Sequence, residues 1–465
     1  MADSDLDAAV QDFARRFRAA LDPPAQAGVT IARAELAARF DEPLPEHGVP
    51  LESILGELEA RSADGLAGGT GGRYFGYVTG GSLPAAAIVE AWTAAVDQNP
   101  GMWPLGPAAV ELEQVTIRWL ADLLGVPATA GYFGSGATMA NTVGLAVARH
   151  WFGRKHGVDV AQEGVRALPE FGVYASEELH LSDHKALRTL GLGSGCVRPV
   201  PIDAEYRMRV EPLVEAIERD RAAGVVPAIV IAQAGSVNTG AADPLDEIAD
   251  VCERYGLWLH VDGAFGAFFR LCERTAPLVR GMERADSLTV DAHKWLNVPN
   301  GVGFALLRDA ELHAETFGGS AGYLTPGAGA NLHELGIEAS RSWRGASVWA
   351  ALKQLGRDGV GELVTRCCDL ARELAEAVEE HPRLELAAPA PSNIVCFRYV
   401  RDGIDAEQVN REVQARVAAG GVVFHTGAVL DGRFCQRAAF SSWRTTSDDV
   451  QALVREVVAT GDSLT

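Results

Sequence analysis

Short apolar segments that alternate with helical patterns through the middle of the chain constrain its fold most strongly. The apolar runs FGVYAS, VPAIVIAQA, LWLHVDGAF, SLTVDAHKW and VGFALLRD are separated by segments with helical spacing, such as PLDEIADVCERYG. Strands and helices that alternate in this way predict a mostly parallel sheet with crossover helices. In such sheets the functional groups gather at the carboxyl ends of the strands.

The flanking segments have different patterns, and the length of 465 residues exceeds the roughly 250–300 residues at which one hydrophobic core stops growing. The N-terminal run LDAAVQDFARRFRAAL has helical spacing, whereas strands and helices alternate again near the C-terminus. We therefore predict an α/β protein with three parts: an N-terminal helical segment (residues 1–78), a large domain with the sheet (79–345) and a small C-terminal α+β domain (346–465).

The charge and the cysteines exclude several classes of function. The formal net charge of −21 argues against a nucleic acid or an anionic membrane surface as partner. The longest apolar runs, such as VVPAIVIA, are shorter than the roughly 18–20 residues that a membrane helix needs, and the acidic N-terminus does not resemble a signal peptide. The seven cysteines form no C-x-x-C pair, so we expect no metal site and reduced thiols in the cytoplasm.

Two residues at predicted strand ends are candidates for chemistry. Lys294 follows the apolar run in TVDAHKWL, and Asp262 ends the run LWLHVD one helix-sized segment earlier. A desolvated lysine has a lowered pKa and can form an imine with an aldehyde, although a lysine at this place can also extend to solvent. Asp262 can hold a proton on a ring nitrogen or simply cap a helix. Both would lie at the same edge of the sheet.

Two further features lie at predicted helix N-termini. Residues 134–138, GSGAT, precede an apolar helix, and His180 begins a helix after a short strand. The first can bind an anion such as phosphate through backbone N–H groups, or be a tight turn without a ligand. The imidazole of His180 can stack on a planar ring, or be a helix cap or a packed core residue. No one of the four features is decisive alone.

Taken together and in chain order, these features resemble the group II pyridoxal-phosphate-dependent amino acid decarboxylases, which include aromatic amino acid and glutamate decarboxylases. The resemblance runs from about Tyr74 to the last helix and is strongest in ADSLTVDAHKWLNVP, LWLHVDGAFG and the GSGAT run. It implies fold type I, the aspartate aminotransferase-like fold, with pyridoxal 5'-phosphate as cofactor and an L-amino acid as substrate. It also implies a homodimer with the active site at its interface.

The resemblance also assigns roles to individual residues. Lys294 resembles the Schiff-base lysine, Asp262 the partner of the pyridine nitrogen and His180 the imidazole stacked on the ring, and these three are the predicted catalytic residues. The other predicted cofactor-binding residues are Ala137, Thr138, Ala264, Asn238 and His293. The predicted substrate-binding residues are Tyr77, Val78, Thr79, Trp103, Asn238 and Arg437.

The chain departs from its relatives in a loop that bears on the product. Active relatives carry a tyrosine in a mobile loop, which is linked to protonation of Cα, and relatives with phenylalanine there form an aldehyde. The corresponding segment, GGSAGYLTPGAGANLHEL, is rich in Gly and Ala; Tyr323 aligns with an earlier tyrosine, and His333 is the other donor. Met139 replaces the Glu of many relatives, and Asp291 replaces the Asn of several.

The leading hypothesis is decarboxylation of an L-amino acid, with an aromatic side chain favoured, to the amine and carbon dioxide. His333, Tyr323 and His180 are the candidate proton donors. An aldehyde-forming oxidative decarboxylase, an aminotransferase or a carbon–carbon lyase with the same cofactor are alternatives. A catalytically idle binding protein is a further alternative, which the intact set of Lys294 and Asp262 argues against.

Overall fold

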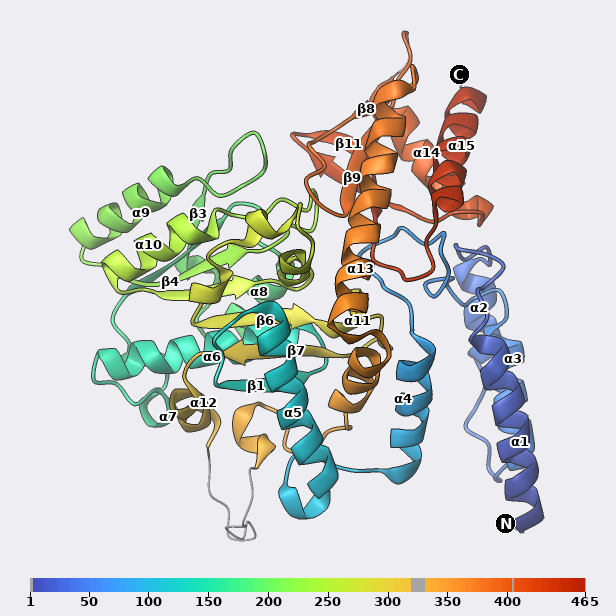
Figure 1. The fold of residues 1–465 in the computed structure, drawn as a ribbon, viewed down its shortest axis with the longest axis horizontal. Helices are drawn as coiled ribbons and strands as arrows, with labels where there is room; N and C mark the ends of the chain where they lie inside the picture. Colours follow the sequence, from blue (N-terminus) through green and yellow to red (C-terminus); the bar gives the residue numbers. More distant parts are fainter. Residues whose placement is uncertain (1–2, 319–330, 404, 465) are drawn as a thin grey trace. The chain divides into compact units, whose positions relative to one another are not determined.

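The computed structural model of the chain describes residues 3–318, 331–403 and 405–464 (Figure 1). They form two compact units: a larger one of residues 80–372 and 388–395, and a smaller one of residues up to 79 together with 373–387 and 396–465. The N-terminal helices therefore share a unit with the C-terminal sheet. The larger unit also includes most of α13 (Gly345–Glu380), beyond the domain boundary predicted at 345/346.

The larger unit is built on a seven-stranded sheet with the order β1-β7-β6-β5-β4-β2-β3. The strands are β1 (Ala130–Gly134), β2 (Phe171–Ser176), β3 (Val197–Val200), β4 (Val226–Gln233), β5 (Trp258–Asp262), β6 (Ser287–Asp291) and β7 (Gly303–Leu307). Strands β2 to β6 pair in parallel, whereas β7 is antiparallel to both β6 and β1. The predicted α/β fold with a mostly parallel sheet is confirmed.

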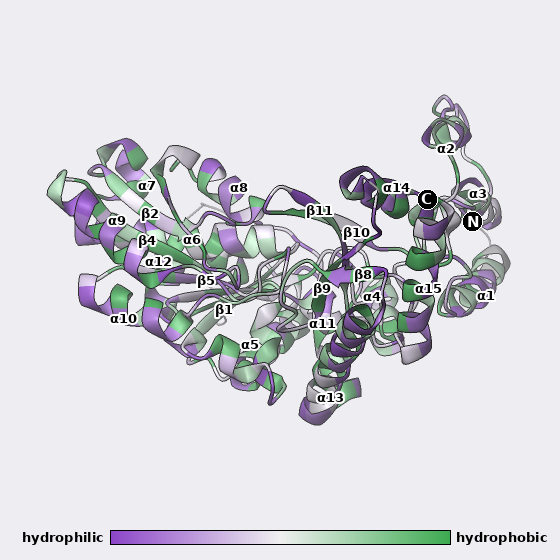
Figure 2. Ribbon diagram, turned by 90° about the horizontal axis from the view of Figure 1, so that it is seen from above, coloured by the Kyte–Doolittle hydropathy of each residue, from purple (hydrophilic) through white to green (hydrophobic). Residues whose placement is uncertain are grey.

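Helices cover both faces of this sheet, which explains why its central strands are apolar on both faces. Figure 2 shows α5 and α10 on one side of the strands and α7 and α8 on the other. Helix α6 packs on β1, β5, β6 and β7 and on α8. The helices of the unit besides α13 are α4 (Pro84–Val96), α5 (Pro107–Leu124), α6 (Ala137–Lys155), α7 (Val160–Glu163), α8 (Leu181–Thr189), α9 (Val210–Ala222), α10 (Leu245–Tyr255), α11 (Ala292–Trp295) and α12 (Ala310–Phe317).

The turn between β1 and α6 is tight and closely packed. Gly136 has a φ of 141°, a conformation that side chains rarely adopt, and it precedes the first residue of α6. A Cβ on Gly303 of β7 would lie only 2.6 Å from the carbonyl carbon of Gly136. The two glycines thus let β7 approach the turn, which fixes where the N-terminus of α6 lies relative to the strand ends.

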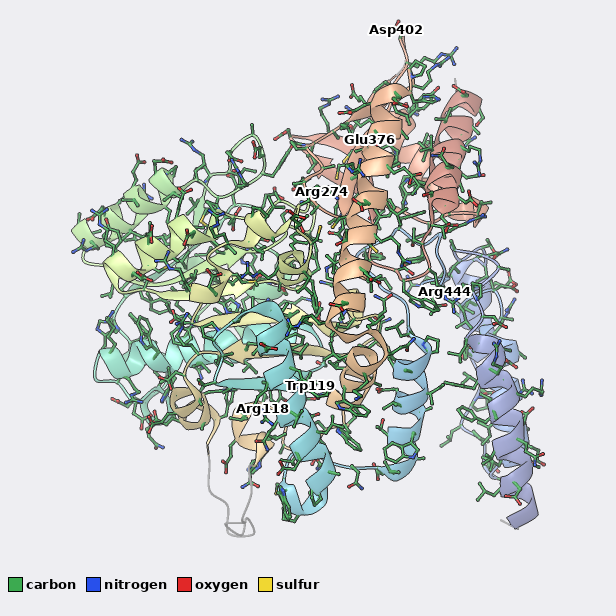
Figure 3. All side chains as sticks on the ribbon, viewed as in Figure 1. Arg118, Trp119, Arg274, Glu376, Asp402 and Arg444 are labelled. Carbon is green, nitrogen blue, oxygen red and sulfur yellow. The ribbon has the colours of Figure 1, made fainter. Side chains whose placement is uncertain are left out.

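The smaller unit combines helices from both ends of the chain with a four-stranded sheet of order β10-β11-β9-β8. Figure 3 labels Arg444, whose guanidinium lies over the ring of Trp443 and donates to the carbonyl of Leu21 at the end of the N-terminal helix. The elements of this unit are α1 (Asp3–Ala20), α2 (Arg33–Phe40), α3 (Leu51–Ser62), β8 (Leu384–Leu386), β9 (Ile394–Tyr399), α14 (Ala406–Gly420), β10 (Thr426–Leu430), β11 (Arg433–Ala439) and α15 (Ser447–Ser463).

The helices also bear on the membrane prediction. None of those in residues 3–318, 331–403 and 405–464 combines the length and the apolar character that a bilayer crossing demands. All seven cysteines are free and buried.

Candidate active site

The carboxyl ends of β5 and β6 and the N-termini of α6 and α8 surround a cavity of about 290 Å³ in the larger unit. This is near the lower end of the volumes of small-molecule sites, roughly 300 Å³. Seven predicted site residues line it: Ala137, Thr138, His180, Asp262, Ala264, His293 and Lys294. The fold thus brings together side chains from four separate segments at one edge of the sheet.

Lys294 lies on the short helix α11, directly after β6, and its side chain turns into the cavity. Its Nζ is 3.0 Å from Asp291 Oδ2 and 5.6 Å from the centre of the Phe265 ring, and 19% of the side chain is exposed. The other oxygen of Asp291 accepts the backbone N–H of Ala137 at 2.6 Å. Asp291 therefore links the lysine to the first turn of α6, and the alternative of a lysine extended to solvent does not apply.

Asp262 ends β5 and is held as a buried carboxylate. Its Oδ2 accepts from Asn141 Nδ2 at 3.0 Å and its Oδ1 from the backbone N–H of Ala264 at 2.9 Å. Burial alone would raise the pKa of Asp262, but these two hydrogen bonds and the charge of Lys294 lower it. Asp262 is thus an anion at the edge of the cavity.

A chain of hydrogen bonds behind Asp262 fixes its orientation. Trp258 Nε1 donates to Ser287 Oγ at 2.9 Å, and His260 bridges Ser287 Oγ (2.8 Å) and Asn141 Oδ1 (3.0 Å). Because the amide oxygen can only accept, His260 donates from Nε2 and accepts from Ser287 at Nδ1. Burial lowers the pKa of His260 to about 4, so the ring is neutral. Each group in this series of hydrogen bonds donates to the next one in the direction of Asp262.

His180 follows β2 and also caps α8, so the predicted helix cap is real. Its Nδ1 accepts the backbone N–H of Ser182 at 3.2 Å and lies 2.7 Å from Ser182 Oγ. Since Nδ1 accepts, the proton of the neutral ring is on Nε2. Burial lowers the pKa of His180, so the cavity wall holds a neutral imidazole.

The N-terminus of α6 is suited to an anion. The helix is 19 residues long, and its N-cap Gly136 supplies no side-chain hydrogen bond. Ala137, Thr138 and Met139 of its first turn line the cavity. The N–H of Ala137 donates to Asp291 and that of Met139 to the carbonyl of Gly136, so the positive end of the helix dipole is what favours a phosphate at this place.

Two predicted cofactor residues differ in their surroundings. His293 lines the cavity, and its Nδ1 donates to the carbonyl of Val302 at 2.9 Å. The amide of Asn238 instead donates to Glu178 Oε2 at 2.7 Å, and the neighbouring Val237, not Asn238, is among the lining residues. The predicted role of Asn238 thus remains a prediction.

The predicted substrate residues are divided between the units. Tyr77, Val78, Thr79 and Arg437 belong to the smaller unit, where Arg437 Nη1 donates to the carbonyl of Tyr77 at 2.9 Å. Burial lowers the pKa of Arg437. Trp103 belongs to the larger unit, outside the cavity lining, and its indole N–H donates to Glu111 at 3.3 Å.

The candidate proton donors also lie in different surroundings. His180 lines the cavity. His333 does not, and its Nδ1 donates to the carbonyl of Gly101 at 3.1 Å. Tyr323 lies outside the described residues.

Sequence reasoning missed several residues around the cavity, among them Asn141, Gln233 and Phe265. One signal was present: His260 and Asp262 are polar residues two positions apart in a strand that is otherwise apolar. Residues at this spacing share one face of a strand, so a second buried polar group beside Asp262 was predictable.

Comparisons with known proteins agree with this geometry. Residues 34–400 match the pyridoxal-dependent decarboxylase conserved domain. The chain belongs to this family. It is a pyridoxal-phosphate-dependent amino acid decarboxylase, a carbon–carbon lyase.

Two relatives and one solved structure illustrate the range of similarity. An aromatic-L-amino-acid decarboxylase of Bacillus atrophaeus is 29% identical over 445 residues, 94% of this chain and 90% of the relative. An L-2,4-diaminobutyrate decarboxylase of Rhizobium meliloti (strain 1021) is 30% identical over 432 residues, which are 91% of this chain and 84% of that relative. The crystal structure of Oryza sativa TDC with PLP and tryptamine superposes with a TM-score of 0.90 at 24% identity, covering 99% of this chain and 97% of that one.

The cavity of the decarboxylase fits its cofactor, pyridoxal 5'-phosphate. The positive N-terminal end of the 19-residue helix α6 suits the phosphate, and a lysine amine at the cavity wall suits the aldehyde. A buried carboxylate with a lowered pKa suits the ring nitrogen. All three groups open into one cavity.

Proposed function

We propose that this decarboxylase converts an aromatic L-amino acid to the corresponding amine and carbon dioxide. In this proposal Lys294 binds the aldehyde of the cofactor, Asp262 pairs with the ring nitrogen and His180 covers a ring face. Ala137 and Thr138 bind the phosphate, and Ala264 and His293 pack around the ring. The observation that carries the proposal is the convergence of these groups on one cavity.

The residues of the site divide the work between charge and position. When bound, the cofactor withdraws electrons from Cα, which allows the bond to the carboxylate to break. Asp262 stays an anion because Asn141 and Ala264 donate to it, so it favours a proton on the ring nitrogen. The carboxylate of Asp291 holds the amine of Lys294, with Nζ 3.0 Å from Oδ2, in a position where the amine can take up or return a proton.

An aromatic substrate agrees with the apolar part of the cavity wall. Met139, Val237 and Phe265 all line it, and an aromatic ring gains from apolar and ring contacts. One relative is named for aromatic amino acids. The other is named for L-2,4-diaminobutyrate, so the two substrate classes make different predictions that an assay separates. We propose that Tyr77, Val78, Thr79, Trp103, Asn238 and Arg437 contribute to substrate binding.

The route of the proton back to Cα decides between amine and aldehyde. The segment around Tyr323 and His333 lacks the second tyrosine of active relatives, which favours oxidative decarboxylation as the second candidate function. That reaction consumes oxygen and water and releases the aldehyde, carbon dioxide, ammonia and hydrogen peroxide. Decarboxylation to the amine needs only one proton, from His180, His333 or Tyr323.

We also propose that the enzyme is a homodimer of the cytoplasm. Ile88 and Trp92 on α4 are 53% and 55% exposed, and Trp119, labelled on α5 in Figure 3, is 40% exposed. Large apolar side chains exposed on a helix surface suit a protein interface. The seven free buried cysteines suit a reducing compartment. Sedimentation of the purified protein tests the dimer, and a monomer at assay concentration would contradict it.

The function is tested by product analysis with purified enzyme and cofactor. Carbon dioxide, amine, ammonia and peroxide are measured with L-tryptophan, L-tyrosine, L-phenylalanine, L-2,4-diaminobutyrate and L-glutamate. We expect equal amounts of carbon dioxide and amine and the highest kcat/KM with an aromatic substrate. Ammonia and peroxide in place of the amine would establish the oxidative reaction, and a preference for diaminobutyrate would contradict the aromatic assignment.

A further inference from the structure

A third acidic residue, Asp183, lies next to Asp262 and has no role in the reaction described so far. It is the third residue of α8, and its exposed fraction is 0%. One side-chain atom each of His180, Asp183 and Asp262 lie within 4.8 Å of one another. Among the described protein atoms, neither carboxylate oxygen of Asp183 has a hydrogen-bond donor. A buried anion without a donor is strongly unfavourable.

Two neighbouring carboxylates form a hydrogen bond only if one of them carries a proton, and the surroundings decide which one does. Asp262 receives donors from Asn141 and Ala264 and lies near the ammonium of Lys294, which together lower its pKa. Asp183 receives no side-chain donor. Burial, followed by the charge of Asp262, raises the pKa of Asp183 well above its usual range. The proton of the pair is therefore on Asp183.

We propose that Asp183 is a positioning residue: a neutral carboxylic acid that donates a hydrogen bond to Asp262 and keeps Asp262 ionised toward the cofactor's ring nitrogen. The inference rests on the role proposed for Asp262. Hydrogen bonds to a charged acceptor contribute more than neutral ones and favour the charged form. A hydrogen bond from Asp183 thus makes the carboxylate of Asp262 a weaker base. The proton between Asp262 and the ring nitrogen of the cofactor would then stay on the nitrogen.

The titratable groups around Asp183 are few. β5 contributes Asp262 and, through Asn141, the neutral His260, the N-cap of α8 contributes His180, and α11 contributes Lys294 near Asp262. Of the elements packed against α8, α6 has Arg149, which donates to Leu190 at the other end of the helix, and η3 (Ser194–Cys196) has a thiol whose pKa burial raises to about 11. Loss of the Asp183 proton at high pH would therefore place two anions side by side.

Two substitutions separate the donor from the charge. Asp183→Asn keeps a hydrogen-bond donor of the same shape but cannot ionise. Asp183→Val removes the donor and leaves an apolar side chain in its place. Asp220→Asn is the matched control, because Asp220 is also buried but accepts from Tyr174 and Arg198, away from the cavity. The affinity for pyridoxal phosphate is measured by absorbance titration of each full-length protein from neutral to alkaline pH.

We expect Asp183→Val to bind the cofactor roughly tenfold more weakly, as for loss of a hydrogen bond to a charged group. Asp183→Asn should stay within about threefold of the wild type near neutral pH, and it should not show the alkaline weakening that wild-type protein shows. Equal affinity and pH dependence for wild type and Asp183→Val would overturn the inference. So would an Asn variant that behaves like the Val variant.

A second readout does not depend on the cofactor. A carboxyl whose pKa is raised in the folded state contributes stability that is lost as pH rises toward that pKa. The melting temperature of cofactor-free Asp183→Asn should therefore exceed that of the wild type by an amount that grows with pH, whereas Asp220→Asn should show no such gain. A constant difference would contradict a protonated Asp183.

Two controls assign a negative result. If Asp262→Asn leaves cofactor affinity and absorbance unchanged, the role of Asp262 is wrong; if only the Asp183 variants are without effect, this inference alone is wrong. The triad His180, Asp183 and Asp262 also has a geometry that a metal ion could use. Weaker cofactor binding of the wild type in the presence of a chelator would indicate that use and overturn the inference.

Discussion

The cavity wall of the larger unit and the substrate segments of the smaller unit hold their polar groups in different ways. In the wall, Asp262 and Asp291 each receive defined donors from another strand or helix. In the smaller unit, the side chain of Tyr77 is mostly exposed, with a left-handed φ of 56°, and the buried Arg437 donates to its backbone carbonyl. The wall is pre-organised for one cofactor, whereas the substrate segments are held mainly through the backbone. The chemistry should therefore tolerate fewer changes than the choice of substrate.

The largest effect is expected for Lys294→Ala, because no other amine of the wall can bind the aldehyde. Decarboxylation should fall by more than roughly 10³-fold, and the absorbance of the lysine-bound cofactor should disappear. Lys353→Ala, an exposed lysine on α13, is the matched control and should retain both. Residual turnover within tenfold of the wild type would remove Lys294 from the mechanism.

Asp262→Asn should come next, since it keeps the shape of the side chain but not its charge. We expect kcat to fall by roughly 10²-fold at saturating cofactor, and the cofactor to bind more weakly although Lys294 still holds it. Steady-state kinetics and absorbance measure the two effects separately. If kcat is unchanged, the wall does not act through a charge at the ring nitrogen.

A smaller effect is expected on the substrate side. Arg437→Lys replaces a planar group with a point charge and should raise KM by roughly tenfold with a smaller change in kcat, as for one charge-assisted hydrogen bond. Arg433→Lys, four residues earlier at the exposed end of β11, should leave KM unchanged. A fall in kcat with constant KM would show that Arg437 acts in the catalytic step, and it would contradict the difference between the two regions.

The smallest effect compares one buried histidine from each region. Burial lowers the pKa of both His260 and His425 to about 4. Since the unfolded pKa is higher, each contributes stability that is present above about pH 6.5 and is lost as pH falls toward about 4. The first part of this loss, roughly 1 kcal/mol, occurs between about pH 8 and about pH 6. His260→Gln and His425→Gln should each reduce this acid dependence in denaturant titrations. Only His260→Gln should also change the cofactor absorbance, and an equal change in both variants would contradict the difference between the regions.

The sequence was sufficient for the fold and for most of the predicted cofactor residues that line the cavity. Apolar runs such as VPAIVIAQ predict buried strands because helices cover both faces of the sheet. Asp262 ends β5, and Lys294 directly follows the neighbouring β6. The network behind Asp262 was not predictable in detail. Asn141 is an ordinary helix residue until α6 packs against β5, and its partner His260 is distant in the sequence. A neutral Asp183 depends on burial, which a local pattern does not show.

The predicted neighbour of the cofactor near residue 238 shows the same limit on a smaller scale. A loop position is fixed by the path of the backbone, and here Val237 lines the cavity while the amide of Asn238 turns to Glu178. Motif matching locates such a segment but not the direction of each side chain. The strand ends are more reliable because their alternation fixes which residues share a face.

The central claim is that Lys294 binds pyridoxal phosphate, and the chain permits a direct test because its only lysines are Lys155, Lys185, Lys294 and Lys353. Borohydride treatment of the purified enzyme fixes the cofactor to its lysine, and peptide mass spectrometry then identifies that lysine. We predict that the modification is on the peptide with Lys294 and on no other. Modification of Lys155, Lys185 or Lys353 in its place, or a protein without bound cofactor, would contradict the account.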